Sequence, residues 1–173
     1  MHRLFFAIPL PDGLREKFSG LVSREKLSLV KWVSTKNLHI TVHFLGATHP
    51  DQFSRIIKSG KEISASTSSF VLKLDCFETI LENRKPVMIW AQFEKSDTFE
   101  KLCLQLRKAL PTEETRKPVP HATLARIRQL KQLPFDLPAV HSGSFSADQP
   151  QLIESLTHPD DAAYRVIESW ELK

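Results

Sequence analysis

The chain contains few cysteines, and this shortage excludes sites that depend on clustered thiols. Cys76 and Cys103 are the only two cysteines among 173 residues, and neither belongs to a Cys-x-x-Cys pair of the kind that binds zinc. We therefore expect no cysteine-based metal site. Both thiols are expected to behave as small apolar side chains in a reducing compartment.

Long apolar runs are also missing, and no segment has the length and hydrophobicity needed to cross a membrane. The apolar stretch Leu4–Ile8 is too short for the core of a signal peptide, and Pro9 and Pro11 follow it closely. We interpret it as the first strand of a cytoplasmic protein. Glycine is scarce, with five residues, and no low-complexity stretch is present, so the composition does not indicate disorder.

What the chain does contain is typical of a soluble globular protein. Hydrophobic residues make up 41% and charged residues 25% of the sequence, and eleven phenylalanines with three tryptophans supply core volume. A chain of this length suits one domain. Because no extended linker interrupts the sequence, we predict a single bilobal domain over residues 1–173, and we expect a monomer.

The charge is mildly basic, with a formal net charge of +4, which suits a polyanionic partner without proving one. Basic residues concentrate late in the chain, opposed there only by Glu113 and Glu114. They are Arg107, Lys108, Arg116, Lys117, Arg126, Arg128 and Lys131. This stretch is either a solvated surface or a surface that follows a phosphate backbone.

The apolar patterns predict a mixture of strands and helices, and therefore an α+β fold. Strands are predicted at residues 3–8, 31–33, 37–45, 70–80, 87–93, 121–127, 142–146, 151–156 and 164–172. Helices are predicted from residue 12 to about 29, from 51 to about 63 and from 97 to 110. Residues 129–140 are predicted to form a loop.

The most informative pattern is His-x-Thr followed by an apolar residue, which occurs at His39–Val42 and again at His121–Leu124. In a strand, residues i and i+2 point to the same face. Each motif therefore places an imidazole beside a hydroxyl and turns its other two residues toward the core. Because a helix precedes each motif strand, we predict two related halves. Each half is an antiparallel-rich sheet with outer helices, and the halves enclose a central cleft.

Two opposed His-x-Thr pairs provide the groups needed for acid–base chemistry on a phosphate. A free imidazole has a pKa of about 6.5, so one histidine can accept a proton while the other donates one. Hydroxyls beside them can donate hydrogen bonds to the oxygens of a phosphodiester. The pattern needs no metal and no cofactor. The chemistry of near-symmetric motifs leaves open which histidine is the acid.

The segments around the two motifs, Asn37–Gly46 and Pro120–Arg126, closely resemble the paired motifs of the two-histidine phosphoesterases. Within that superfamily they are most similar to the bacterial and archaeal RNA 2′,3′-cyclic phosphodiesterases, long called 2′-5′ RNA ligases. The segments Arg3–Ile8 and Tyr164–Leu172 are also similar. The resemblance therefore covers nearly the whole chain and is most specific at the two motifs. It implies a bilobal, pseudo-twofold α+β fold.

The resemblance implies opening of RNA 2′,3′-cyclic phosphate ends to 2′-phosphates, with a weaker reverse joining of tRNA halves through a 2′-5′ linkage. By the same resemblance His39 is the proton donor to the leaving 3′ oxygen and His121 is the base that activates water. Thr41 and Thr123 would hold the phosphate. Other implied substrate-binding residues are Arg126, Ser155 and Tyr164. Strict strand alternation turns Arg126 away from His121, so its place in the site requires a strand end or a bulge.

His43 lies two residues beyond Thr41, and strand alternation predicts that it shares the face of His39. We expect a solvated side chain there, and contact with RNA at the mouth of the cleft is the alternative. Two other functions remain open from the sequence. One is a module that binds RNA ends without turning them over, and the other is a phosphodiesterase for another cyclic or 2′-5′-linked nucleotide.

Overall fold

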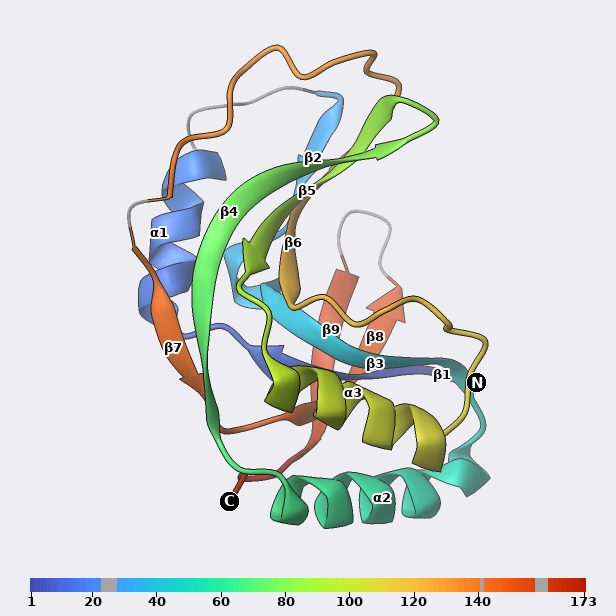
Figure 1. Cartoon of the computed structure of the whole chain (residues 1–173). Coiled ribbons are helices and arrows are strands. Elements are labelled where there is room, and N and C mark those ends of the chain that lie inside the picture. Colours follow the sequence, from blue (N-terminus) through green and yellow to red (C-terminus); the bar gives the residue numbers. More distant parts are fainter. Residues whose placement is uncertain (23–27, 141, 158–161) are drawn as a thin grey trace.

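The computed structural model describes residues 1–22, 28–140, 142–157 and 162–173 (Figure 1). The strands are β1 (His2–Pro9), β2 (Val30–Trp32), β3 (His39–Thr48), β4 (Phe70–Glu82), β5 (Lys85–Phe93), β6 (His121–Ile127), β7 (Ser144–Ala147), β8 (Gln151–Thr157) and β9 (Ala162–Ser169). The helices are α1 (Asp12–Val22), α2 (Phe53–Ser66) and α3 (Asp97–Ala109), and the short 3-10 turns are η1 (Thr35–Asn37) and η2 (Pro50–Gln52).

The strands of the described residues form one curled antiparallel sheet. Its order is β7-β4-β5-β6-β3-β1-β8-β9, and β2 pairs with β6 outside this path. The half that carries the first motif contains β3, β1, β8 and β9, and the half that carries the second contains β6, β5, β4 and β7. The two predicted sheets are joined edge to edge where Ile40 of β3 pairs with Ala122 of β6. The α+β class and the antiparallel pairing are confirmed.

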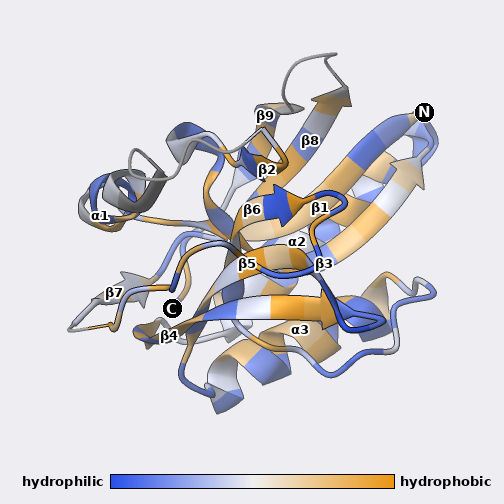
Figure 2. Ribbon diagram, turned by 90° about the horizontal axis from the view of Figure 1, so that it is seen from above, coloured by the Kyte–Doolittle hydropathy of each residue, from blue (hydrophilic) through white to orange (hydrophobic). Residues whose placement is uncertain are grey.

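The helices cover the outer face of this sheet, and the core lies beneath them. Figure 1 shows α2 and α3 side by side below the strands and α1 beside β4 and β7. On α1, Phe18 packs edge-on against Phe77 of β4. Figure 2 shows hydrophobic residues concentrated along the central strands, whereas the connecting loops are mostly hydrophilic. The sheet therefore keeps one face for the core and the other for solvent.

Close packing between α2 and the sheet depends on a glycine. A Cβ atom on Gly60 would lie 2.7 Å from the ring of Trp170 and 2.9 Å from the ring of Phe6. Those two rings are themselves stacked, with centroids 5.8 Å apart. The absent side chain therefore lets the helix approach β1, which runs beside the strand of the first motif.

One predicted boundary is wrong. The first helix was expected to reach about Leu29, but Leu29 lies in a turn and β2 begins at Val30. Val30 is buried and pairs with Ile127 of β6, so the apolar residues of this segment serve the sheet. The intervening residues 23–27 lie outside the described residues. The other predicted strands and helices all occur, with ends displaced by a few residues.

Candidate active site

The two motif strands turn their histidines and threonines toward a cleft. Within β3, Ile40 and Val42 are buried at 0% and 3% exposure, whereas His39 and Thr41 are only partly buried. The same alternation occurs in β6, where the core-facing residues are Ala122 and Leu124. This is the pattern expected of strands with one face on a core and one face on solvent.

The junction between the halves brings the four motif side chains together. Because β3 and β6 run antiparallel through the Ile40–Ala122 pair, His39 lies beside Thr123 and Thr41 lies beside His121. All four line one cleft with a volume of about 340 Å³. The structure therefore forms a shared site from two segments that lie about eighty residues apart in the chain.

A register shift follows each motif and changes which residues face the cleft. Between β1 and β3, Phe6 pairs with His43 and Ala7 with Thr41, so Val42 is an extra residue on β3. Between β5 and β6, the pairs Ile89–Ala125 and Trp90–Thr123 leave Leu124 as the extra residue on β6. Each bulge makes two successive residues face the core and returns the next one to the cleft.

The bulges explain the positions of Phe44 and Arg126. Each lies five residues after its motif histidine, is exposed and lines the cleft. The sequence placed Arg126 in the site only if a strand end or a bulge followed the motif, and the bulge at Leu124 meets that condition. Phe44 was not predicted as a site residue, although its spacing from His39 equals that of Arg126 from His121. The guanidinium of Arg3 lies over the Phe44 ring, 5.0 Å from its centroid.

The prediction for His43 is wrong. This side chain is 2% exposed, on the core side of β3, and its Nε2 lies 2.7 Å from the carbonyl oxygen of Leu110. The bulge at Val42 reverses the alternation on which the prediction depended. Burial lowers the pKa of His43, and the hydrogen bond to Leu110 partly opposes this effect. His43 is therefore neither a solvated residue nor part of the motif face.

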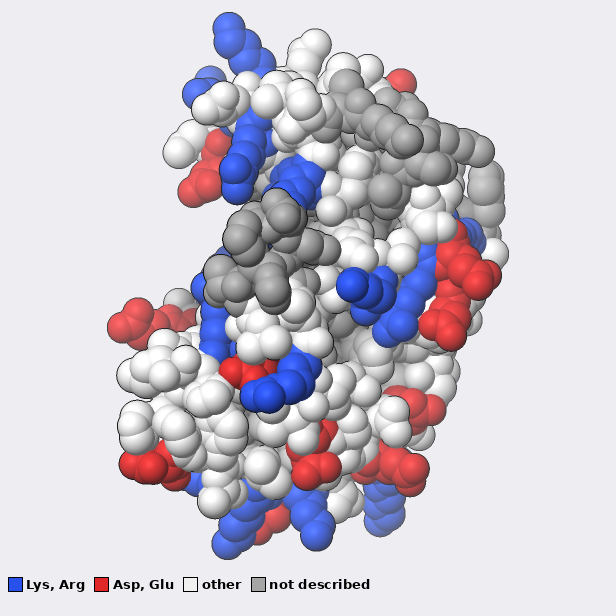
Figure 3. All heavy atoms as spheres, turned by 180° about the vertical axis from the view of Figure 1, so that it is seen from behind, with Lys and Arg blue, Asp and Glu red and all other residues white. Residues whose placement is uncertain are grey.

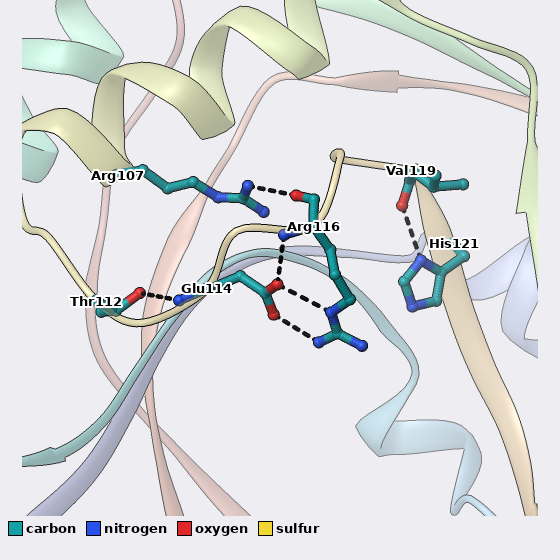
Figure 4. A network of polar contacts seen from close by, with 6 residues as sticks. All are labelled: Arg107, Thr112, Glu114, Arg116, Val119 and His121. Carbon is teal, nitrogen blue, oxygen red and sulfur yellow. Dashed lines mark hydrogen bonds and ion pairs between the residues drawn. The ribbon is translucent and has the colours of Figure 1, made fainter. Parts of the chain in front are cut away.

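Both motif histidines are held by the same backbone hydrogen bond. His39 Nδ1 lies 2.7 Å from the carbonyl oxygen of Asn37, and His121 Nδ1 lies 2.8 Å from that of Val119. A carbonyl can only accept, so Nδ1 carries the hydrogen in each ring. Figure 4 shows this bond at His121. The arrangement leaves Nε2 of each imidazole as the nitrogen available for proton transfer.

The two imidazoles have different aromatic neighbours. The ring of His39 contacts Phe5 and Tyr164, with centroid distances of 4.9 Å and 5.4 Å. The ring of His121 lies almost flat on Trp90, at 3.6 Å and an interplanar angle of 17°. These contacts fix both ring planes. The contact between His121 and Trp90 is the closer one. Trp90 is the diagonal neighbour of His121 across the β5–β6 pair, because Trp90 pairs with Thr123 and Gln92 pairs with His121.

Burial lowers the pKa of both motif histidines. For His39 desolvation is the largest cause, the bond to Asn37 opposes it, and the charge of His121 lowers the pKa further. For His121 desolvation again dominates, and the guanidinium of Arg116 adds to the decrease. Desolvation disfavours the charged form of an imidazole. Burial therefore favours the neutral rings, and an anionic substrate would counteract this effect.

The outer cleft is cationic and includes the remaining predicted residues. Ser155 and Tyr164 form a cross-strand pair between β8 and β9, and both line the cleft. The lining also contains Arg128, which belongs to the basic stretch noted in the sequence, and two cations that were not predicted there, Arg3 and Lys31. No carboxylate lines the described part of the cleft. In the space-filling view the molecule is hollowed on one side, and Lys and Arg side chains lie around the hollow (Figure 3).

Trp32 of β2 also lines the cleft. Its ring stacks on Phe135, with centroids 6.5 Å apart and planes at 27°, and it packs against the core.

Among the described residues, no group of three or more His, Cys, Asp or Glu side chains is placed to hold a metal ion. None of the helices in the described ranges has the length and hydrophobicity to span a membrane.

Comparison with known proteins relates the chain to one family. The sequence profile described as "LigT like Phosphoesterase" matches residues 8–90, which include the first motif. The RNA 2′,3′-cyclic phosphodiesterase of Methanocaldococcus jannaschii is 27% identical over 97% of this chain and 99% of its own length. The protein of the same name from Bacillus subtilis is 29% identical over 70% of this chain and 69% of its own.

The chain is similar to the LigT-like phosphoesterases over residues 8–90 and to an enzyme named RNA 2′,3′-cyclic phosphodiesterase over nearly all of its length. These relatives identify it as an enzyme that acts on phosphate esters. The fold agrees with that of solved LigT-like structures. Apo LigT of E. coli superposes with a TM-score of 0.83 at 24% identity over 99% of this chain and 97% of that one. A protein of Thermus thermophilus superposes with a TM-score of 0.84 at 23% identity, over 98% and 97% of the two chains.

Proposed function

We propose that this enzyme is an RNA 2′,3′-cyclic phosphodiesterase that opens a terminal cyclic phosphate to a 2′-phosphate. The observation that carries the proposal is that His39 and His121 line one cationic cleft. In each ring Nδ1 donates a hydrogen bond to a backbone carbonyl, which leaves Nε2 for proton transfer. The names of the curated relatives agree with it. An RNA end with a cyclic phosphate supplies the anion that this cleft suits.

The reaction is an in-line displacement at phosphorus with a histidine on each side. Nε2 of His121 takes a proton from water as its oxygen forms a bond to phosphorus. The bond from phosphorus to O3′ breaks, and O3′ takes a proton from Nε2 of His39, which begins the step as an imidazolium. Solvent then returns one proton to His39 and removes one from His121. General acid–base catalysis of this kind is worth about 10²–10⁴-fold per group.

The threonines complete the phosphate site. Thr41 lies beside His121 and Thr123 beside His39, so each hydroxyl can donate to a non-bridging oxygen while the imidazoles act on the bridging ones. Arg126, Ser155 and Tyr164 line the same cleft and are proposed to contact the nucleotide. The same groups would also join two RNA ends through a 2′-5′ linkage. In that reaction a 5′-hydroxyl, in place of water, attacks the phosphorus of the cyclic phosphate.

Product analysis tests this proposal. An RNA that ends in a 2′,3′-cyclic phosphate is incubated with the enzyme in the presence of a chelator, and we expect a 2′-phosphate as the product. His39→Ala and His121→Ala should each lower the rate by about 10²–10⁴-fold. His49→Ala should not, because His49 is exposed and only caps the η2 turn. A wild-type rate in either motif variant would contradict the mechanism. Tight binding without product would favour the RNA-end-binding module.

A further inference from the structure

The segments that precede the two motifs break the symmetry of the cleft. Before His39, β2 is hydrogen-bonded to β6, and the amide of Val33 donates to the carbonyl of Leu124 at 2.8 Å. Before His121, residues 112–119 belong to no strand and make no described backbone hydrogen bond to β3. One side of the cleft is therefore closed by β2, and the equivalent side is open.

The open side forms a groove of about 350 Å³ between β3 and the segment 112–119. It is lined in part by residues that also line the cleft, namely Thr41, Phe44, His121, Thr123 and Arg126. The groove is therefore a continuation of the cleft. Its apolar lining includes Phe44, Met88 and Val119, and Phe99 and Cys103 of α3 lie buried beneath it.

The rim of the groove is positively charged. Arg107, Lys117 and Arg126 contribute cations. The only carboxylate in the described lining is Glu114, and its two oxygens already accept hydrogen bonds from Arg116 at 2.9 Å and 2.5 Å. Figure 4 shows this pair and the bond from Arg107 to the backbone of Arg116. Three cations therefore remain to attract an anion.

The groove also presents apolar surface to a ligand. Phe44 and Val119, each 38% exposed, line it. Among the described residues, the side-chain atoms Trp90 Nε1 and Arg107 Nε have no hydrogen-bond partner, but they are buried, so a ligand in the groove does not reach them. An exposed aromatic ring is a surface on which a nucleobase can stack.

We propose that the groove binds the nucleoside that precedes the cyclic end, with its linking phosphate near Lys117 and Arg126. The exposed ring of Phe44 and the other apolar side chains of the lining suit the faces of a nucleobase, and the cationic rim suits the phosphate. The inference rests on the proposed function and narrows its substrate class. The preferred substrate is an RNA strand of two or more nucleotides, not a free nucleoside 2′,3′-cyclic phosphate.

The test compares adenosine 2′,3′-cyclic phosphate with the dinucleotide ApA that ends in the same group. The wild-type enzyme should show a higher kcat/KM for the dinucleotide. Lys117→Ala should remove at least half of that preference and leave the mononucleotide rate within twofold. It should also reduce the slope of log kcat/KM against log salt for the dinucleotide by about 0.7, the value for one phosphate contact on a single strand. Lys117→Arg should restore both.

Lys108→Ala is the matched control, because it removes one exposed cation from the other face of α3. It should change neither the preference nor the salt slope. Equal wild-type kcat/KM for the two substrates would overturn the groove proposal and leave the proposed function intact. A preference that survives Lys117→Ala but is lost in Arg128→Ala would place the strand at the opposite end of the cleft and would also overturn it. Hydrolysis of neither substrate would refute the proposed function itself.

Discussion

Replacing Trp90 by leucine should weaken catalysis by releasing the ring of His121. The indole and imidazole planes lie 3.6 Å apart between centroids and within 17° of parallel, so the indole restricts the ring that must present Nε2 to the substrate. Aromatic pairs of this kind are worth about 0.5–1.5 kcal/mol beyond the area they bury. At about 1.4 kcal/mol per tenfold change, we expect a two- to twelvefold decrease in kcat/KM.

The assay uses adenosine 2′,3′-cyclic phosphate, because the mononucleotide does not require the groove. Trp90→Phe keeps an aromatic face under His121 and should recover most of the rate. Trp90 is only partly buried, so both variants should fold, which circular dichroism would verify. A wild-type kcat/KM in Trp90→Leu, or equal losses in the leucine and phenylalanine variants, would refute the idea that the stack positions the histidine.

Three further predictions follow from the site and from the packing beneath it. Thr41→Val and Thr123→Val remove a hydroxyl at nearly constant volume, and each should lower kcat by about 10²–10³-fold with little change in KM; steady-state kinetics measure this, and a loss confined to KM would contradict it. Because burial lowers the pKa of both motif histidines from 6.5, the singly protonated free enzyme is most abundant below pH 6.5, so kcat/KM should be bell-shaped with its maximum there; a maximum above pH 7.5 would be incompatible with these shifts. Gly60→Ala introduces a Cβ against Trp170 and Phe6 and should reduce the free energy of unfolding by about 1–3 kcal/mol, as measured by urea denaturation, whereas Gly20→Ala, which meets no atom within 4 Å, should not.

Much of the site was predictable because the period of a strand is local. Alternation alone placed His39 and Thr41 on one face and Ile40 and Val42 on the other, as the structure confirms. A bulge depends on the register with a neighbouring strand, which no local pattern records. The bulge at Val42 is why His43 was misplaced.

Tertiary pairing decided the other features that the sequence left open. The end of the first helix was misjudged because Val30 pairs with β6, an interaction between distant segments. The groove beside β3 exists because residues 112–119 do not pair with that strand, whereas β2 pairs with β6. Both segments precede a motif of the same form, and their local composition does not indicate this difference.

The most direct test of the account is a histidine-detected NMR titration of the protein with inorganic phosphate. The central claim is that the imidazoles of His39 and His121 face one phosphate site. The side-chain signals of both should shift and saturate with a single dissociation constant, while that of His49 stays unchanged. Shifts confined to one motif histidine, or two clearly different dissociation constants, would contradict the claim.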